Sequence, residues 1–356
     1  MNKLDFVYQG RPTRVVFGAG SLQHLEREVL QLNANRAIIL CSPEQRQLGD
    51  AVAARLGNRA VAVFDKATMH VPMELAHTAR ALAREVGADC AVAVGGGSTV
   101  GLGKAIALDS SLPILAIPTT YAGSEMTPIY GITESGLKKT GTDLRVLPRT
   151  VIYDPDLTVS LPVELSVTSG INAIAHAAEG LYSRDANPVV SLMAEEGIAA
   201  LARSLPGIVA APNDITARSD ALYGAWLCGS VLGSVGMALH HKLCHTLGGS
   251  FNLPHAQSHT IVLPHALAYN RRAAPDAMER IARALRTDDA AIGIYELAKA
   301  NGASIALKDI GLRAEDVERA AEIASGNPYW NPRPIERAAI QALIQDAFDG
   351  VPPRDH

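Results

Sequence analysis

Short apolar runs alternate with helical patterns along the first half of the chain, and no other feature constrains the fold as much. Four runs have the length and the β-branched content of buried strands: residues 36–41, 60–64, 90–94 and 113–117. Residues with helical spacing, such as 74–86 and 100–108, lie between them. Strands that alternate with helices build a parallel, doubly wound sheet covered on both faces. We therefore expect an α/β protein with a Rossmann-like sheet domain over residues 1–160.

The pattern changes after Asp154-Pro155, where Ala-rich helical runs replace the β-branched ones. The runs cover residues 165–183, 189–205, 215–239, 240–247, 275–284, 290–301, 313–324 and 336–348. They predict an all-helical C-terminal domain over residues 161–356, which would carry the substrate and catalytic groups. Residues 221–239 carry no charge and could span a bilayer by length. Their glycines and serines dilute the hydrophobicity, which favours a helix buried in the helical domain.

Composition and charge exclude several classes of protein. Hydrophobic residues make up 48% and charged residues 19%, so the chain is not disordered. The net charge is −4 and no dense Lys/Arg run appears, which argues against a nucleic-acid partner. Four widely spaced cysteines form no CxxC, and the N-terminus lacks the apolar core of a signal peptide. We expect a cytoplasmic protein with no membrane partner.

A glycine loop stands where the third apolar run meets a helical pattern. It consists of Gly95, Gly96, Gly97 and Ser98. Glycines permit close backbone approach, and the N–H groups at a helix start favour a phosphate. Thr119 and Thr120 follow the next strand, at the strand end where α/β proteins bind ligands. The loop is not the spaced GxGxxG form, and a tight turn without a ligand is the alternative. Together with the threonines, it predicts a dinucleotide site.

Ser42 follows the first apolar run, at a position where many NAD-specific sites carry an acidic residue. An acidic residue there binds the ribose hydroxyls and repels a 2′-phosphate. A small neutral residue removes that repulsion, so we expect either NADH or NADPH as the cofactor.

Six of the eleven histidines fall between His240 and His265. His241 and His245 share one helix face, and His255 follows Pro254 ten residues later. Asn172 and His176 are also spaced i,i+4. A single histidine is more often a core or surface residue, whereas two helices that each present polar groups at this spacing can converge on one pocket. These five residues are the predicted catalytic group.

These segments make the chain resemble the iron-containing alcohol dehydrogenase superfamily over nearly its full length. Further matches are Phe17-Gly-Ala-Gly20, Lys104 and the segment from Pro118 to Glu125. Within the superfamily, the chain is most similar to the maleylacetate reductases. The resemblance implies an oxidoreductase that reduces the C=C bond of 2-maleylacetate, a small dicarboxylate, to 3-oxoadipate in aromatic-compound degradation. It also implies a homodimer, in which an edge strand near residues 5–17 would pair across a two-fold axis.

The chain departs from the superfamily at its metal site. The superfamily binds a divalent metal through one Asp and three His, whose positions are Asn172, His176, His241 and His255 here. An amide oxygen is a weaker, neutral ligand than a carboxylate. We therefore expect a site without metal, as the likeness to the maleylacetate reductases implies. Two further departures are Gly101, where the superfamily has Asp, and a threonine loop shortened to Thr-Thr-Tyr-Ala-Gly.

The resemblance and the chemistry together suggest roles for these side chains. His241 and His245 would stabilise an enolate and donate a proton. His176 and His255 would line the pocket and bind a carboxylate, and Asn172 would donate its amide N–H. The predicted substrate-binding residues are Tyr121 and Lys242.

Three other interpretations remain open from the sequence. The first is a metal-dependent alcohol dehydrogenase that tolerates Asn172 and acts on a small alcohol or aldehyde, with iron or zinc. The second is a lyase like the dehydroquinate synthases, although their lysine-rich substrate pocket has no obvious counterpart in this chain. The third is a non-catalytic nucleotide-binding protein, which would need no histidine array.

Overall fold

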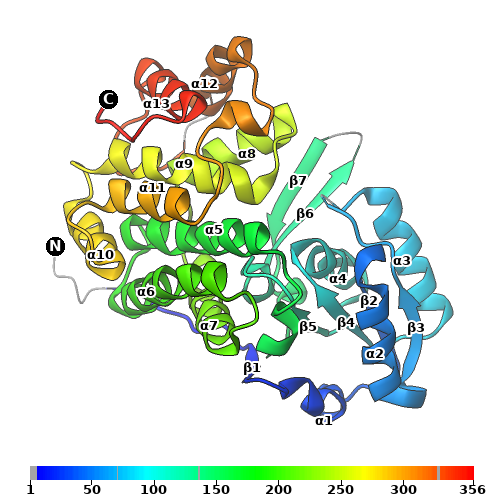
Figure 1. Ribbon diagram of the computed structural model, residues 1–356. Coiled ribbons are helices and arrows are strands. Elements are labelled where there is room, and N and C mark those ends of the chain that lie inside the picture. The colour runs from blue at the N-terminus through cyan, green and yellow to red at the C-terminus, as the bar shows by residue number, and fades with distance from the viewer. Residues whose placement is uncertain (1–5, 70, 135–136, 327–328) are drawn as a thin grey trace. The chain divides into compact units, whose positions relative to one another are not determined.

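The computed structural model of the protein describes residues 6–69, 71–134, 137–326 and 329–356 (Figure 1). The chain forms two units, one over residues 10–161 and one over residues 162–356 together with 6–9. The first unit is an α/β domain and the second is helical. The α/β fold with a helical C-terminal region is confirmed.

A six-stranded parallel sheet forms the centre of the α/β unit, in the order β1-β8-β5-β4-β2-β3. All four predicted strands are present, as β2 (Ala37–Leu40), β3 (Ala60–Phe64), β4 (Cys90–Gly95) and β5 (Ile114–Pro118). The sheet also contains β1 (Arg14–Phe17) and β8 (Thr150–Tyr153). The predicted edge strand near residues 5–17 is shorter than expected, because β1 begins at Arg14. The first residue of the predicted strand, Asp5, lies outside the described residues.

Helices cover both faces of this sheet. Ile39 and Val92 point toward α1 (Leu25–Gln31) and α2 (Arg46–Leu56). Ile38 and Leu40 point toward α3 (Met73–Glu85) and α4 (Gly97–Ser110). The helix after β2 and the helix after β4 therefore lie on opposite faces, although the two strands are neighbours. Such a switch point is where doubly wound sheets bind ligands, beyond the carboxyl ends of the strands.

An antiparallel hairpin of β6 (Ile129–Glu134) and β7 (Leu137–Thr142) follows the sheet strand β5. The sequence did not suggest it, because these residues form no apolar run. The buried ammonium of Lys104 holds the preceding loop by donating to oxygens of Ser124, Thr127 and Ile129 at 2.7–3.3 Å. Burial lowers the pKa of Lys104 to about 7, and the nearby carboxylate of Glu125 opposes that shift.

The helical unit is organised around α5 (Val163–Tyr182), whose residues are almost all buried from 166 onward. It packs against α6 (Pro188–Ala210) and α7 (Ile215–Leu232). Glycines bring α6 and α7 close together, since a Cβ at Gly224 would lie 2.9 Å from the carbonyl oxygen of Gly197. Within the residues that the structure describes, every helix is too short or too polar to traverse a bilayer.

The uncharged run over residues 221–239 is not one helix. The predicted helix 215–239 is wrong in extent, because α7 ends at Leu232 and α8 (Leu239–Phe251) begins seven residues later. Side chains near the end of α5 hold the intervening loop: Ser183 donates to the carbonyl oxygen of Gly236, and Asp185 accepts from its N–H. The break is therefore set by tertiary contacts that a hydropathy pattern does not contain.

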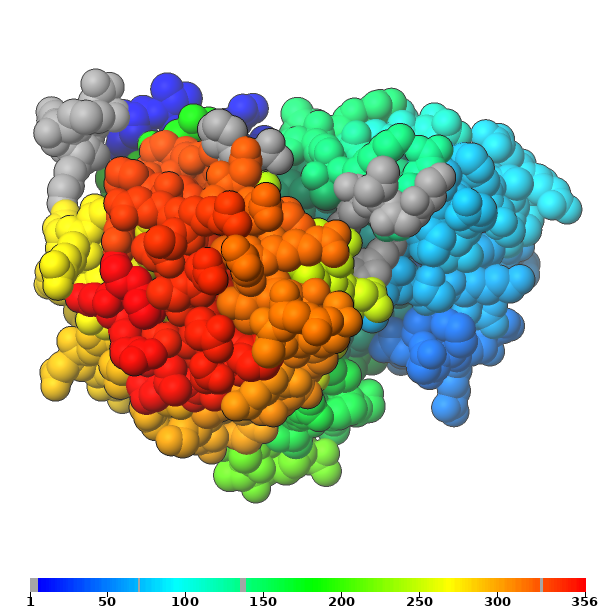
Figure 2. Space-filling view, turned by 90° about the horizontal axis from the view of Figure 1, so that it is seen from above, coloured from blue at the N-terminus to red at the C-terminus, as the bar shows by residue number. Residues whose placement is uncertain are grey.

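The remaining helices complete the helical unit. They are α9 (His255–Asn270), α10 (Pro275–Leu285), α11 (Ala290–Ala300), α12 (Val317–Gly326) and α13 (Arg337–Asp349). Short 3₁₀ turns lie at 21–24, 43–45, 57–59, 124–126, 144–146, 155–158, 307–310 and 314–316. Helices α8, α9, α12 and α13 share one apolar core. Figure 2 shows the C-terminal helices, in orange and red, packed together at the surface of this unit.

We predict that His265 on α9 makes stability fall at acid pH. Neither ring nitrogen has a hydrogen-bond partner among the described residues. Burial lowers the pKa of His265 from 6.5 to about 4, with Arg354 and His356 acting in the same direction and Asp346 against it. The unfolded chain binds this proton below pH 6.5 and the folded chain only near pH 4. Because the folded protein keeps this side chain neutral, its unfolding free energy falls by about 3 kcal/mol as the pH drops from 6.5 to 4.

The measurement is the urea-unfolding free energy of wild type and H265L at pH 7, 5.5 and 4.5. Below pH 6.5, the unfolding free energy of wild type should fall relative to that of H265L. The slope should correspond to the uptake of about one proton on unfolding. Parallel pH profiles would contradict the prediction.

Candidate active site

Two helices of the helical unit bring three of the predicted catalytic side chains into contact. Asn172 and His176 lie on one face of α5, and His241 lies near the start of α8. Nδ1 of His176 is 2.9 Å from Nε2 of His241, and Nδ2 of Asn172 is 3.4 Å from Nε2 of His176. All three side chains are buried. The i,i+4 spacing in the sequence thus corresponds to a real cluster.

The other two predicted histidines are exposed neighbours of this group. His245 stands one turn along α8, with its ring centroid 6.2 Å from that of His241. His255 is the first residue of α9, and its ring centroid lies 4.3 Å from that of buried His259. The cluster therefore has an accessible side made by His245 and His255 and a buried side made by His176 and His241.

Glu179 is a member of this cluster that the sequence reasoning missed. Its fully buried carboxylate lies 2.7 Å from Nδ1 of His241, and it accepts hydrogen bonds from the N–H groups of Ala238 and His240 at 2.9 and 2.7 Å. Burial alone would raise the pKa of Glu179, but the contacts with His241 and these N–H groups hold it below its ordinary value. A signal was present, because Glu179 follows His176 by three positions in an Ala-rich helix.

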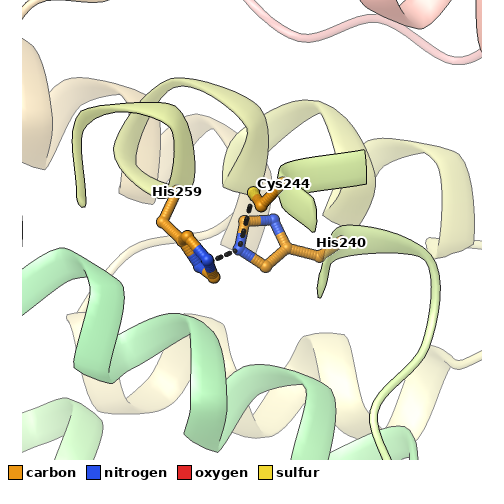
Figure 3. A group of neighbouring side chains, drawn as sticks. All are labelled: His240, Cys244 and His259. Atoms are coloured by element: carbon orange, nitrogen blue, oxygen red, sulfur yellow. Dashed lines mark hydrogen bonds between the residues drawn. The ribbon is translucent and has the colours of Figure 1, made fainter. Parts of the chain in front are cut away.

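Behind the cluster lies a second buried group, formed by His240, Cys244 and His259 (Figure 3). Nε2 of His240 is 2.9 Å from Nδ1 of His259 and 3.7 Å from the sulfur of Cys244. Burial lowers the pKa of both histidines well below 6.5 and raises the pKa of the Cys244 thiol. All three side chains are therefore neutral near pH 7.

The second group has three potential ligand atoms within 4.8 Å, yet its geometry is that of a hydrogen-bonded histidine pair. Metal-bound histidines nearly always donate from their other ring nitrogen to a fixed partner. Nδ1 of His240 and Nε2 of His259 have no hydrogen-bond partner among the described residues.

The residues at the superfamily's metal positions fit a divalent metal poorly. Nε2 of His241 faces a nitrogen of His176, and the amide of Asn172 supplies no charge. In the part of the chain that the structure describes, the one grouping of three possible metal ligands is His240, Cys244 and His259. None of these positions holds the acidic ligand that would neutralise the metal, and the carboxylate of Glu179 is engaged by His241 and by two backbone N–H groups.

The two predicted substrate-binding residues lie in different units, Lys242 directly after His241 in α8 and Tyr121 in the α/β unit. The ammonium of Lys242 sits 5.7 Å from the centre of the Tyr329 ring, so it makes a cation–π contact there. Tyr121 is fully buried in the α/β unit, directly after Thr120.

The predicted cofactor residues meet at the carboxyl ends of three neighbouring strands. Gly95 ends β4 with φ +147°, and Gly96 precedes α4, whose start has no side-chain cap. The N–H of Thr119 donates to the carbonyl oxygen of Gly95 at 3.1 Å, which joins the two loops. Gly97 is exposed, and Ser98 and Thr120 are half-buried. An uncapped helix start in a glycine loop fits the phosphates of a dinucleotide.

Ser42 is half-buried two residues beyond β2, at the strand next to β4. A hydrogen bond from its side chain lowers the pKa of the exposed Glu44 carboxyl. The carboxylate of Glu44 therefore places a negative charge near this strand end, two residues after the neutral Ser42.

Gly101 has a structural explanation. A Cβ there would lie 3.0 Å from a methyl carbon of Val71, a buried residue with φ +43°. The valine side chain thus occupies the space into which the superfamily's Asp side chain would extend.

We predict that Gly95→Ala damages the cofactor loop. An alanine Cβ would lie 2.6 Å from side-chain oxygens of Gln45 and Thr99, at a φ that favours glycine. We expect a loss of about 1–3 kcal/mol in unfolding free energy and weaker NADH binding. The measurements are urea unfolding and a titration of NADH fluorescence.

Gly97→Ala is the matched control for folding, because its Cβ would meet only the Cβ of Ala122 at 3.8 Å. Its unfolding free energy should match that of wild type. Equal stability of wild type and G95A would contradict the predicted strain.

Comparison with known proteins places the chain in a family. Residues 12–155 match the iron-containing alcohol dehydrogenase family, and residues 166–348 match the C-terminal domain of Fe-containing alcohol dehydrogenases. A maleylacetate reductase from Burkholderia cepacia is 62% identical over 98% of this chain and 99% of its own length.

Solved structures agree. A putative alcohol dehydrogenase from Ralstonia eutropha JMP134 has a TM-score of 0.97 and 64% identity, over 98% of this chain and 99% of its own. Maleylacetate reductase from Rhizobium sp. strain MTP-10005 has a TM-score of 0.95 and 52% identity, over 98% of this chain and all of its own. The chain is therefore an oxidoreductase that belongs to the iron-containing alcohol dehydrogenase family and, within it, to the maleylacetate reductases.

Proposed function

We propose that this protein reduces the C=C bond of 2-maleylacetate to give 3-oxoadipate, with NADH or NADPH and without a metal, in the degradation of aromatic compounds. The single observation that carries the metal-free part is the contact between Asn172, His176 and His241. An amide and a hydrogen-bonded imidazole pair stand where the family has metal ligands. The names of the relatives support the substrate.

The substrate chemistry suits such a site. Maleylacetate carries a ketone conjugated to its C=C bond, so hydride added at the carbon β to the ketone places negative charge on the ketone oxygen as an enolate. Bound reduced nicotinamide would supply that hydride. An enolate is delocalised and can be stabilised by hydrogen-bond donors. An isolated alkoxide would depend more strongly on a Lewis acid.

The histidines would divide the work by their positions. His245 and His255 lie on the accessible side of the cluster and would contact the dicarboxylate, a role that replaces the proton donation suggested for His245 by the sequence. His241 acts through its contact with His176, and this pair would hold the proton that finally reaches the carbon α to the ketone. Asn172 would orient the pair or the substrate through its amide.

The α/β unit would bind the cofactor. Its glycine loop and the start of α4 would hold the phosphates, with Thr119 and Thr120 beside them. Ser42 would lie near the adenosine ribose. Tyr121 and Lys242 would contact the substrate. An unchanged KM for maleylacetate in Lys242→Met would remove Lys242 from the proposal.

Isotope transfer tests the reaction. With NADH carrying deuterium at the transferable position, the proposal predicts 3-oxoadipate with deuterium on the carbon β to the ketone. One NADH should be consumed for each product molecule. Deuterium at the former carbonyl carbon of an alcohol product would instead indicate alcohol dehydrogenase chemistry.

A homodimer is part of the same proposal. Strand β1 lies at one edge of the sheet, and Phe6, Val7 and Tyr8 shortly before it are exposed apolar residues. An exposed strand edge can pair with a second copy. Light scattering at micromolar concentration should give twice the mass of one chain, and a monomer mass would contradict this part.

A further inference from the structure

A continuous line of contacts runs from Glu179 through two imidazoles to Asn172. Oε2 of Glu179 is 2.7 Å from Nδ1 of His241, Nε2 of His241 is 2.9 Å from Nδ1 of His176, and Nε2 of His176 is 3.4 Å from Nδ2 of Asn172. Every member is buried, so water does not compete along the line. The direction in which these hydrogen bonds point decides where a proton can enter or leave.

The direction is set at the Glu179 end. The N–H of His240 donates to Oε1, and the N–H of Ala238 donates to Oε2. A backbone N–H can only donate, so both oxygens serve as acceptors and the ionised carboxylate is favoured. Nδ1 of His241 must therefore carry the hydrogen that it shares with Glu179.

Each neutral imidazole has one N–H donor and one acceptor nitrogen, so the rest of the line follows. With Nδ1 of His241 protonated, its Nε2 accepts from Nδ1–H of His176. Nε2 of His176 is then the acceptor nitrogen at the end of the line, facing the amide of Asn172. The rare Nδ1–H tautomer is thereby imposed on both histidines.

We propose that Glu179 is the positioning residue that fixes the tautomers of His241 and His176, so that Nε2 of His176 is the acceptor nitrogen at the end of the line. This inference rests on the proposed function, because it names the residue that orients the two histidines of the proposed catalytic group. Glu179 acts through the histidines, and the carboxylate offsets the positive charge while the pair holds an extra proton.

Asn172 fits both proton states of this line. Its Nδ2 donates to neutral His176, and its Oδ1 has no hydrogen-bond partner among the described residues. Rotation of the amide by a half turn would bring Oδ1 to accept from a protonated Nε2. An Asp at this position could accept but, when ionised, could not donate.

The direct test is ¹⁵N NMR of histidine-labelled wild-type protein at pH 7.5, with assignments from the variants H176N and H241N. The proposal predicts Nδ1–H tautomers for both His176 and His241. Nε2–H tautomers for both would overturn it. This readout needs no turnover: predicted tautomers in a protein that fails to reduce maleylacetate would refute the function alone, and the reverse result would refute the inference alone.

The second test is Glu179→Gln, which keeps the side-chain shape and removes the charge. The NH₂ group of the glutamine must face at least one of the N–H donors that now meet the carboxylate, so the tautomers of His241 and His176 become mixed. We expect kcat to fall roughly 10²–10⁴-fold, with KM for NADH unchanged. Wild-type kcat in a folded E179Q would overturn the proposal. Glu179→Asp restores the charge and should recover part of kcat, whereas a purely structural role would give E179D no advantage.

Asp346→Asn is the matched control, since Asp346 is also a buried carboxylate of the helical unit but pairs with Arg354 and His356. It should leave the His176 and His241 tautomers and kcat unchanged. A comparable loss of kcat in D346N would mean that the E179Q effect is an unspecific result of removing buried charge, and it would overturn the assignment.

Discussion

Replacement of His241 by alanine is expected to lower kcat for maleylacetate by roughly 10²–10⁴-fold, the usual contribution of a positioned acid or base. His241 is the only side chain in the described cluster that contacts both Glu179 and His176. Without it, the carboxylate no longer reaches the proton-holding imidazole. Glu179 keeps its backbone donors from Ala238 and His240, so the loop before α8 should still form.

Steady-state kinetics and circular dichroism of H241A measure the two expectations together. KM for NADH should stay near that of wild type, because the glycine loop is in the other unit. His77→Ala is a suitable control, since His77 is exposed on α3. Wild-type kcat in H241A would remove the histidine pair from the mechanism.

Replacement of Asn172 by aspartate is expected to convert the site toward metal binding. The carboxylate would complete the family's set of one Asp and three His, and it would add a negative charge beside His176. At a separation near 4 Å, such a charge is worth several kcal/mol to a cation, so affinity for Zn²⁺ should rise by at least about 100-fold. Because the carboxylate cannot donate to His176, kcat for maleylacetate should fall in metal-free buffer.

Isothermal titration with Zn²⁺ and kinetics in the presence of chelator test both parts. Asn187→Asp provides the control, because Asn187 caps α6 and Asp serves equally well as an N-cap. N187D should bind Zn²⁺ no more tightly than wild type. Equal Zn²⁺ affinity of wild type and N172D would show that the missing carboxylate is not what separates this chain from metal-binding relatives.

Local patterns sufficed for four of the six strands of the sheet and for part of the site. The runs that became β2 to β5 are apolar on both faces because helices cover both faces of the sheet, so each is visible in the sequence alone. Asn172 and His176 could be paired because a helix places i and i+4 side by side.

Other features depend on contacts between distant segments. The break between α7 and α8 is held by Ser183 and Asp185 of a different region, so the uncharged run gave no sign of it. Glu179 follows His176 by three positions, but that spacing does not reveal its partners, and its importance comes from where α8 begins. Lys242 shares a helix with His241, yet the side chain turns to the ring of Tyr329, a residue 87 positions away.

The most direct test of the account is NADH consumption with freshly prepared maleylacetate by protein from which metal has been removed with a chelator. The account predicts undiminished turnover that does not change when Fe²⁺ or Zn²⁺ is added, since imidazole and amide donors stabilise the enolate. No turnover until a metal is restored would contradict it and would favour a metal-dependent alcohol dehydrogenase that tolerates Asn172.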